Sequence, residues 1–190
     1  MPIIDPNKNP VGVHERLQGE TNPRFRRMLE EVRFHIAVEA GGDIEPAIAR
    51  LVPNCEYIIY NHAQQPVTIR GHDAVRSQFY VPLFEAIDVR LEWDIVLCMV
   101  DDHAVITEGR QKQAVKGATL IQAGHNADPN RLYLQHSHHM VVWPFDSELR
   151  LIGETVFMGF SQPLEEVVQS PLKAEDIADY NGPRYDLLAA

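Results

Sequence analysis

The 190-residue chain has few cysteines and no long apolar run. Cys55 and Cys98 match no metal or redox spacing and sit inside apolar segments, so we expect two buried, reduced thiols. The longest apolar run, Ile95–Val100, has the length of a strand and is too short for a membrane span. The first thirty residues show no signal-peptide pattern. These features predict a cytoplasmic protein with no membrane partner.

An excess of basic residues is also missing, because the formal net charge is −10. Such a surface repels a phosphate backbone unless basic residues gather on one face. The basic groups at 24–27 and 110–112 are short and have acidic neighbours. We therefore expect no nucleic-acid partner.

Cofactor-binding and nucleophile motifs are absent as well. The chain has no Gly-x-Gly-x-x-Gly, P-loop, Gly-x-Ser-x-Gly or Cys-x-x-Cys pattern. Strands and helices do not alternate as they do in a parallel nucleotide-binding sheet. If the protein is an enzyme, we expect its chemistry to be independent of a cofactor.

The patterns that are present predict helices first and a meander of strands afterwards. Residues 1–22 are rich in proline, asparagine and glycine and predict an extended arm. Pro23 begins a helical repeat of apolar residues that Gly41–Gly42 ends. The later elements are strands at 55–60 and 66–70, a helix from 71 interrupted by Pro82, and long antiparallel strands at 90–100, 103–115, 131–143 and 148–160, with a loop at 117–130.

This order resembles the nuclear-transport-factor-2-like superfamily, and within it the SnoaL-like group of cyclases, dehydratases and isomerases. The resemblance covers roughly residues 24–160, through the segments FRRMLEEVRFHIAVEAGGDIEPAIARLVPNCEYIIY, IRGHDAVRSQFYVPLF and VVWPFDSELRLIGETVFMG. It implies an α+β fold: a cone-shaped α+β barrel in which a strongly curved, mixed but mostly antiparallel sheet of six strands wraps around a long N-terminal helix. We expect an arm at 1–22, the SnoaL-like domain at 23–160, and a C-terminal extension at 161–190 that packs on the domain or on a neighbouring subunit.

Two departures from the family pattern bear on the chemistry. Many members carry an Asp about four residues after the Gly-Glu pair of the last strand, where this chain has Met158 and Gly159. The Tyr–Asp pair that some dehydratases place on the first helix is also missing. His35 and Glu39, one helical turn apart, are the polar candidates on that helix.

Histidines are the densest chemical signal, in the run Gln135–His139. Alternation along a strand places His136 and His138 on one face and His139 on the other. A neutral imidazole acts as a general base or acid near neutral pH. We expect His138, or His62 near the pocket mouth, to act as the base and His136 to bind substrate. A partly exposed strand with satisfied histidines is the alternative, and a cupin-like metal site is disfavoured because its Glu is missing.

Acidic and basic residues supply further candidates. Glu108 and Arg110 share a strand face, either in the site, with Glu108 catalytic and Arg110 binding substrate, or in a solvated ladder of salt bridges. The resemblance places an acid at the position of Glu108. Glu154, in the family's Gly-Glu pair, is either a pocket carboxylate or the partner that orients a histidine.

Aromatic residues complete the predicted site. Tyr57 and Tyr60 lie on opposite faces of one strand, so only one of the two phenols points inward. An inward phenol donates a hydrogen bond to an oxygen that develops charge. We assign that role to Tyr57, and expect Tyr60 and Trp93 to contact substrate, although core packing is the better explanation of Trp93.

The residues and the resemblance together predict a cofactor-independent lyase that acts on a hydrophobic cyclic or aromatic small molecule. Proton abstraction and elimination would release water, or an aldehyde such as formaldehyde, as family members do from lignin-derived diaryl compounds. Two alternatives stay open: an isomerase or cyclase that uses the same pocket, and a non-catalytic ligand-binding or interaction module. We expect a homodimer or a higher homo-oligomer built on the outer face of the sheet.

Overall fold

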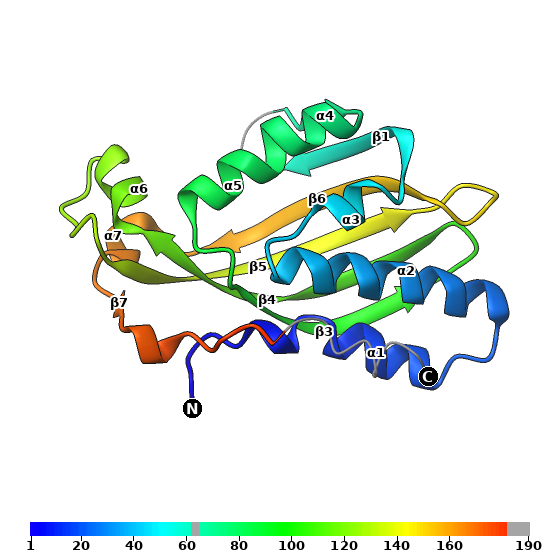
Figure 1. Cartoon of the computed structure of the whole chain (residues 1–190), viewed down its shortest axis with the longest axis horizontal. Helices are drawn as coiled ribbons and strands as arrows, with labels where there is room; N and C mark the ends of the chain where they lie inside the picture. Colours follow the sequence, from blue (N-terminus) through cyan, green and yellow to red (C-terminus); the bar gives the residue numbers. More distant parts are fainter. Residues whose placement is uncertain (62–64, 182–190) are drawn as a thin grey trace.

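The computed structural model describes residues 1–61 and 65–181, and it consists of one curved, open sheet with helices on its concave side (Figure 1). The strand order is β2-β1-β6-β5-β4-β3, and neighbours are antiparallel except for the parallel pair β1–β6. The strands are β1 (Leu51–Tyr60), β2 (Val67–Arg70), β3 (Glu92–Val100), β4 (Ala104–Lys116), β5 (Leu132–Pro144) and β6 (Leu151–Ser161). A two-residue strand, β7 (Pro171–Leu172), adds to β5. The predicted α+β fold with a mixed, strongly curved sheet is confirmed, with this short seventh strand as an addition.

The long helix α2 (Pro23–Ala40) lies across the concave face of the sheet, as Figure 1 shows. The Asn22 side chain accepts a hydrogen bond from the backbone N–H of Arg24, and Pro23 occupies the first helical position, so the helix begins where the sequence predicts. Its apolar face is fully buried against the sheet at Met28, Leu29 and Val32. Burial of this face fixes the orientation of the helix.

Two further helical segments close the concave side. After α3 (Glu45–Ile48), the chain runs through β1 and β2 into α4 (His72–Val75), a π-helical turn at Arg76–Tyr80, and α5 (Val81–Ala86). Pro82, which lacks a backbone N–H, is the second residue after the π-helical turn. The turn buries the whole side chain of Tyr80 inside the core.

The N-terminal arm is not extended over its whole length. It contains a 3-10 turn, Pro6–Lys8, and the helix α1 (Val11–Gln18), which packs against α2 and β3. Gly12 permits this contact, because a Cβ there would lie 2.6 Å from the backbone oxygen of Ile95. The expectation of an extended arm was wrong here, since a helix with two buried apolar residues leaves too short a repeat to recognise.

The C-terminal segment folds back onto the same domain. It forms α7 (Leu164–Val167), β7 and a 3-10 turn at Ala174–Asp176. Ile4 and Ile177 form a β-bridge and share a small apolar cluster on the outer side of the sheet.

The segment 117–130 differs from the predicted loop, because it begins with the helix α6 (Gly117–Gln122).

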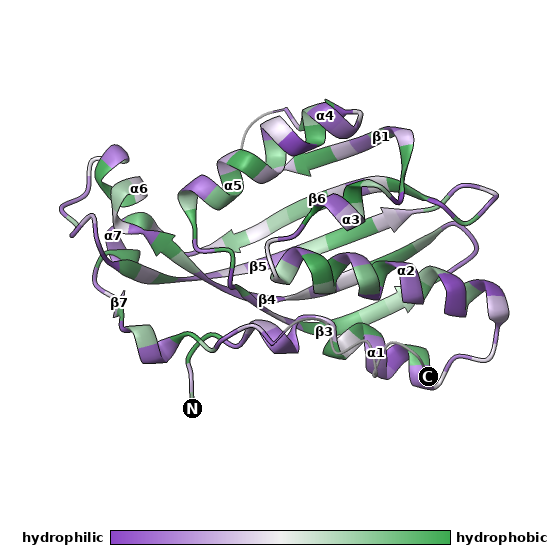
Figure 2. Ribbon diagram, in the orientation of Figure 1, coloured by the Kyte–Doolittle hydropathy of each residue, from purple (hydrophilic) through white to green (hydrophobic). Residues whose placement is uncertain are grey.

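Hydropathy along the ribbon follows the two faces of the sheet. Figure 2 shows hydrophobic and hydrophilic residues interleaved along the long strands, with β3 hydrophobic over much of its length. Among the described residues, no helix combines the length and the apolar character needed to cross a bilayer.

Candidate functional site

A cavity of about 190 Å³ lies between α2 and the concave face of the sheet. Its walls are largely apolar and include Phe79, Trp93 and Trp143. Two carboxylates, Glu39 from α2 and Glu154 from β6, line it together with His139 from β5. An apolar pocket with a few convergent polar groups is the usual form of a small-molecule site.

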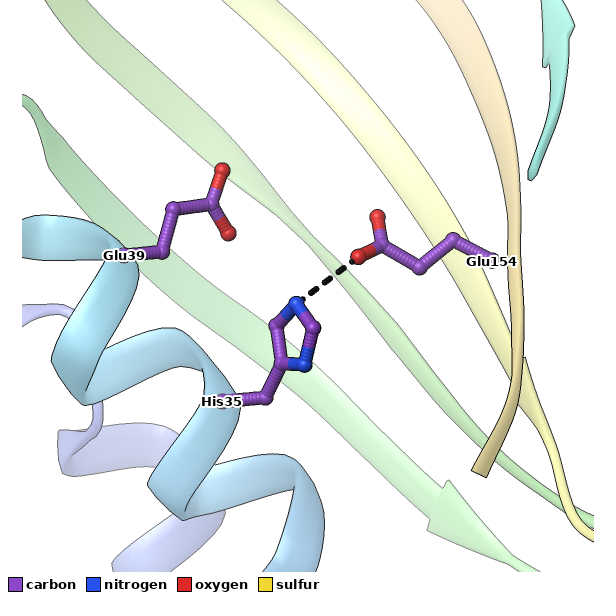
Figure 3. A group of neighbouring side chains, drawn as sticks. All are labelled: His35, Glu39 and Glu154. Carbon is purple, nitrogen blue, oxygen red and sulfur yellow. Dashed lines mark ion pairs between the residues drawn. The ribbon is translucent and has the colours of Figure 1, made fainter. Parts of the chain in front are cut away.

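A buried acid–base cluster stands at one side of this cavity (Figure 3). His35 and Glu39 project from one face of α2, one turn apart, and Glu154 faces them from β6. His35 Nε2 lies 3.1 Å from Glu154 Oε1, and both side chains are buried. One ligand-type atom of each residue lies within 4.8 Å of those of the other two.

Two tyrosine hydroxyls complete the cluster. The Tyr80 hydroxyl lies 3.0 Å and the Tyr57 hydroxyl 3.4 Å from His35 Nε2, and the two hydroxyl oxygens are 3.2 Å apart. The imidazole nitrogen is therefore surrounded by three oxygen atoms. We refer to His35, Glu39, Tyr57, Tyr80 and Glu154 as the buried cluster.

Burial and mutual charge shift the protonation equilibria of the buried cluster. Burial lowers the pKa of His35, but the hydrogen bond and the charge of Glu154 outweigh it and raise this pKa above its usual value. Burial, and then repulsion by Glu154, raises the pKa of Glu39 to about 7, although His35 opposes the shift. Burial, followed by the carboxylate charges, raises the pKa of both tyrosines well above the usual range. Glu39 thus takes up and releases a proton near neutrality, while the tyrosines stay protonated.

Glycine at position 153 explains why Glu154 arrives opposite Tyr57. The φ angle of Gly153 is +150°, and a Cβ there would lie 2.0 Å from the backbone oxygen of Glu56 on β1. Only glycine lets β6 pass this close to β1. The resulting parallel register pairs Tyr57 directly with Glu154.

Three of the residues predicted from the sequence lie on the inner side of the sheet. Tyr57 and Glu154 belong to the buried cluster, and Trp93 lines the cavity wall. For Glu154, both predicted positions apply, because the carboxylate lines the pocket and also holds a histidine. That histidine is His35 rather than one of the histidines of β5.

The placement predicted for His138 and Glu108 needs correction. His138 Nε2 and Glu108 Oε1 lie 2.8 Å apart, at hydrogen-bond distance, on the outer face, away from the cavity. Strand alternation indicated correctly which residues share a face, but it does not reveal which face is concave. The other predicted residues on this outer side are Tyr60, Arg110 and His136.

The outer residues form a feature of their own. Tyr60, Glu108 and His138 border a shallow depression on the convex face together with Phe157 and Phe160. The Tyr60 and Phe157 rings are stacked, with centroids 4.7 Å apart. His62, the alternative base, lies outside the described residues.

Sequence reasoning did not assign roles to four residues of the site: Glu39 and His139, which line the cavity, and His35 and Tyr80, which lie beside it in the buried cluster. The spacing of His35 and Glu39, one helical turn apart, was visible on the first helix and could have identified these two residues. Tyr80 carried no signal, because its burial depends on a π-helical turn. His139 shares its strand face with Gln135 and Ser137, and this alternation separates it from His138.

The buried cluster also contains ligand types for a divalent cation. One imidazole and two carboxylates suit such an ion in principle. However, His35 Nε2 already contacts the hydroxyls of Tyr57 and Tyr80, so an ion bound to this nitrogen would displace both. The arrangement is better described as a proton-sharing network.

Several solved structures share this architecture. A SnoaL-like polyketide cyclase, as it is described, from Jannaschia sp. CCS1 superposes with a TM-score of 0.56 and 16% identity over 80% of this chain and 99% of that protein. An NTF2-like protein from Burkholderia thailandensis gives 0.53 and 16% over 73% and 92%. The chain has the nuclear-transport-factor-2-like fold.

This NTF2-like fold confirms the resemblance read from the sequence. A third similar structure, the epoxide hydrolase/cyclase-like enzyme SalBIII, gives a TM-score of 0.53 and 13% identity over 71% of this chain and 92% of that protein. No family model and no curated protein matches the sequence. These structural similarities establish the NTF2-like fold. At identities this low they do not establish the chemistry, which depends on the residues of the cavity.

Proposed function

We propose that the chain is an enzyme that moves a proton on a small hydrophobic ring compound held in the cavity. The observation that carries this proposal is the contact between His35 and Glu154 inside the buried cluster, with Glu39 beside them. Two acids and a histidine around an apolar cavity provide a base, an acid and a route between them.

The carboxylates are the groups that meet the ligand, because Glu39 and Glu154 line the cavity while His35 lies behind them. In an elimination, Glu39 removes the proton from the carbon next to a carbonyl. Glu154 passes the proton held by His35 to the departing hydroxyl, which leaves as water while the C=C bond forms. Transfer of the first proton from Glu39 to His35 then restores the starting state. His35 is then a positioning and relay residue.

The size of the cavity limits the part of the ligand that reaches the buried cluster. An apolar cavity of about 150 Å³ in another protein holds benzene, so about 190 Å³ accommodates a single six-membered ring with small substituents. A lyase that acts on a cyclic or aromatic compound fits this space. Dehydration is the reaction we favour, and aldehyde release breaks a C–C bond with the same acid and base.

An isomerase or cyclase is the alternative within the same chemistry, because the proton removed by Glu39 returns to a different atom. The cyclase description of the Jannaschia protein and the role of SalBIII in pyran ring formation support acid–base reactions on ring compounds in this fold. A second alternative is a non-catalytic module that binds a ligand in the cavity without reaction.

Deuterium exchange tests proton abstraction without knowledge of the natural substrate. The protein is incubated in D₂O with cyclohexanone, and with 3-hydroxycyclohexanone to detect dehydration, and products are followed by NMR. We expect exchange beside the carbonyl that Glu39→Gln abolishes and His138→Gln, on the outer face, leaves unchanged. Binding of these ketones without exchange in the wild type would support the binding module instead.

A further inference from the structure

The two tryptophans of the inner face differ in one respect. Trp143 Nε1 donates a 2.8 Å hydrogen bond to the hydroxyl of Thr107. Trp93 Nε1 is also buried, yet it has no acceptor within the described part of the chain. A buried indole N–H normally has a partner, so the missing acceptor at Trp93 requires an explanation.

A second ring nitrogen shares this property. His139 Nε2 is buried and finds no hydrogen-bond partner among residues 1–61 and 65–181. Both rings line the same cavity. Two unpaired nitrogens on one wall of a single cavity point to a ligand that supplies the missing hydrogen-bond partner.

Strand register places the two rings on the sheet side of the cavity. Trp93 on β3 pairs with Gln111 of β4, and His139 on β5 pairs with Gly109 of the same strand. One strand therefore separates them, and Gly109 contributes no side chain between them. The buried cluster belongs instead to α2, β1, β6 and the π-helical turn.

The charge of the lining restricts the chemistry of the ligand. Glu39 and Glu154 line the cavity, whereas no lysine or arginine does so among the described residues. A carboxylate or phosphate would meet two acids and no fixed cation. A ligand with a neutral oxygen, such as a ketone, avoids this repulsion.

We propose that Trp93 Nε1 and His139 Nε2 form an oxygen-binding subsite for a neutral carbonyl ligand. The indole N–H only donates, so it needs an acceptor such as a carbonyl oxygen. A neutral imidazole with its proton on Nε2 donates in the same way. Burial, and then repulsion by His138, lowers the pKa of His139 to about 4, which keeps the ring neutral near pH 7.

This subsite deepens the proposed function and, in its catalytic part, rests on it. When Glu39 removes a proton beside the carbonyl, negative charge moves onto the carbonyl oxygen. Donors placed at that oxygen stabilise the enolate that forms, and a neutral imidazole is suited to this task. Recognition of the neutral ketone in the ground state does not depend on any reaction.

Matched one-ring probes test the recognition directly. Acetophenone carries the carbonyl, ethylbenzene lacks it, and benzoate has a similar shape with a negative charge. We expect isothermal titration calorimetry to show that acetophenone binds about tenfold more tightly than ethylbenzene, which corresponds to one net hydrogen bond. Benzoate should bind more weakly than acetophenone.

Trp93→Phe keeps an aromatic wall and removes the N–H, so it should abolish most of the preference for acetophenone over ethylbenzene. His139→Phe should reduce the same preference. Retention of the full preference in Trp93→Phe, or equal binding of the three probes or of none to the wild type, would overturn the subsite.

Thermal unfolding of the ligand-free protein adds a second readout. Both Trp→Phe variants lose ring packing in the core, but only Trp143→Phe also leaves the Thr107 hydroxyl unpaired, so Trp93→Phe should lower the unfolding midpoint less than Trp143→Phe does. A loss in Trp93→Phe as large as that in Trp143→Phe would indicate that the Trp93 N–H has a partner in the free protein. A preference for acetophenone without deuterium exchange would support the subsite and refute the proposed function. Deuterium exchange without that preference would support the proposed function and refute the subsite.

Discussion

His35 Nε2 lies 3.1 Å from Glu154 Oε1, which joins helix α2 to strand β6 inside the core. A buried pair of this kind does two things. It fixes the distance between the helix and the sheet, and it holds a proton that either partner can carry. Removal of one partner leaves the other charge buried without compensation.

Replacement of Glu154 should therefore damage activity more than the fold when the replacement keeps its shape. Glu154→Gln retains a hydrogen-bonding side chain but cannot carry a proton to the leaving hydroxyl, so we expect the rate of dehydration of 3-hydroxycyclohexanone to fall by at least about a hundredfold. Tyr57→Phe should lose less, because its hydroxyl lies behind the acids and contributes hydrogen bonding to His35. Dehydration rates measured by NMR at saturating ketone check both.

His138→Ala is the matched control for this series. The sequence offered His138 as one of two candidate bases, with His62, but the structure places His138 on the outer face, 2.8 Å from Glu108. We expect its dehydration rate to stay within about twofold of wild type, since surface substitutions away from a site change little. A hundredfold loss in His138→Ala with normal rates in Glu154→Gln would move the chemistry to the outer depression.

The elements that the sequence predicted well are those with long, regular repeats. The helix predicted from Arg24 to Ala40 and the long strands after residue 90 were found with small changes at their ends, because their apolar spacing extends over several turns or pleats. Short elements such as α1 and α6 were missed, since a few residues give no periodicity.

The candidate site was harder to predict than the fold for a physical reason. Alternation separated His139 from His138 and Tyr57 from Tyr60 correctly, as the register confirms. The direction of curvature decides which of these faces becomes the cavity, and it depends on how α2 and the π-helical turn pack against the sheet. That packing is a tertiary property that no single strand encodes.

Glu39 should make stability depend on pH in a defined direction. Its pKa is raised from 4.5 to about 7 in the folded protein, so the folded state retains a proton that the unfolded state releases between these values. The contribution of Glu39 to the free energy of unfolding is fully present below the pKa of the unfolded state and is lost as pH rises through the pKa of the folded state. The loss amounts to at most about 3 kcal/mol.

Glu39→Gln removes this proton equilibrium while keeping the side-chain volume. Relative to wild type, the variant should gain stability between about pH 5 and about pH 8, because the wild type loses its contribution over that window. Urea unfolding at both pH values measures the difference. A stability difference between variant and wild type that is constant with pH would contradict the raised pKa. Glu45→Gln, at an exposed position of α3, provides a control with its pKa shifted the other way.

Metal removal should leave the chemistry intact. The mechanism proposed here uses carboxylates and an imidazole as proton carriers, with His35 Nε2 already in contact with two tyrosine hydroxyls. We expect extended dialysis against EDTA to leave the exchange rate unchanged. One equivalent of a transition metal by elemental analysis, lost together with activity in Glu39→Gln, would indicate a metal centre at His35, Glu39 and Glu154 instead.

The outer face of the sheet should be covered by a second copy of the chain. Leu97, Met99 and Phe160 expose 38%, 47% and 57% of their surface on strands whose inner faces are already packed. Leu97 and Met99 lie on the edge strand β3 and Phe160 lies on β6, so exposed apolar residues occur on both sides of this face, as they do at an interaction surface. The depression bordered by Tyr60 and Phe160 adds a shape into which a partner side chain fits.

We therefore expect a homodimer or a higher homo-oligomer in solution, as the sequence also predicted. Leu97→Lys combined with Phe160→Lys places two positive charges on this face, where desolvation on association would oppose assembly. Light scattering should report a monomer for the double variant and a larger species for wild type, with similar circular dichroism for both. Leu97 pairs with Glu108 across β3 and β4, whereas Cys98 is on the inner side, so the double variant should leave ketone binding in the cavity unaltered. A monodisperse wild-type monomer at micromolar concentration would refute the assembly, and an oligomer that survives both substitutions would place the interface elsewhere on the molecule.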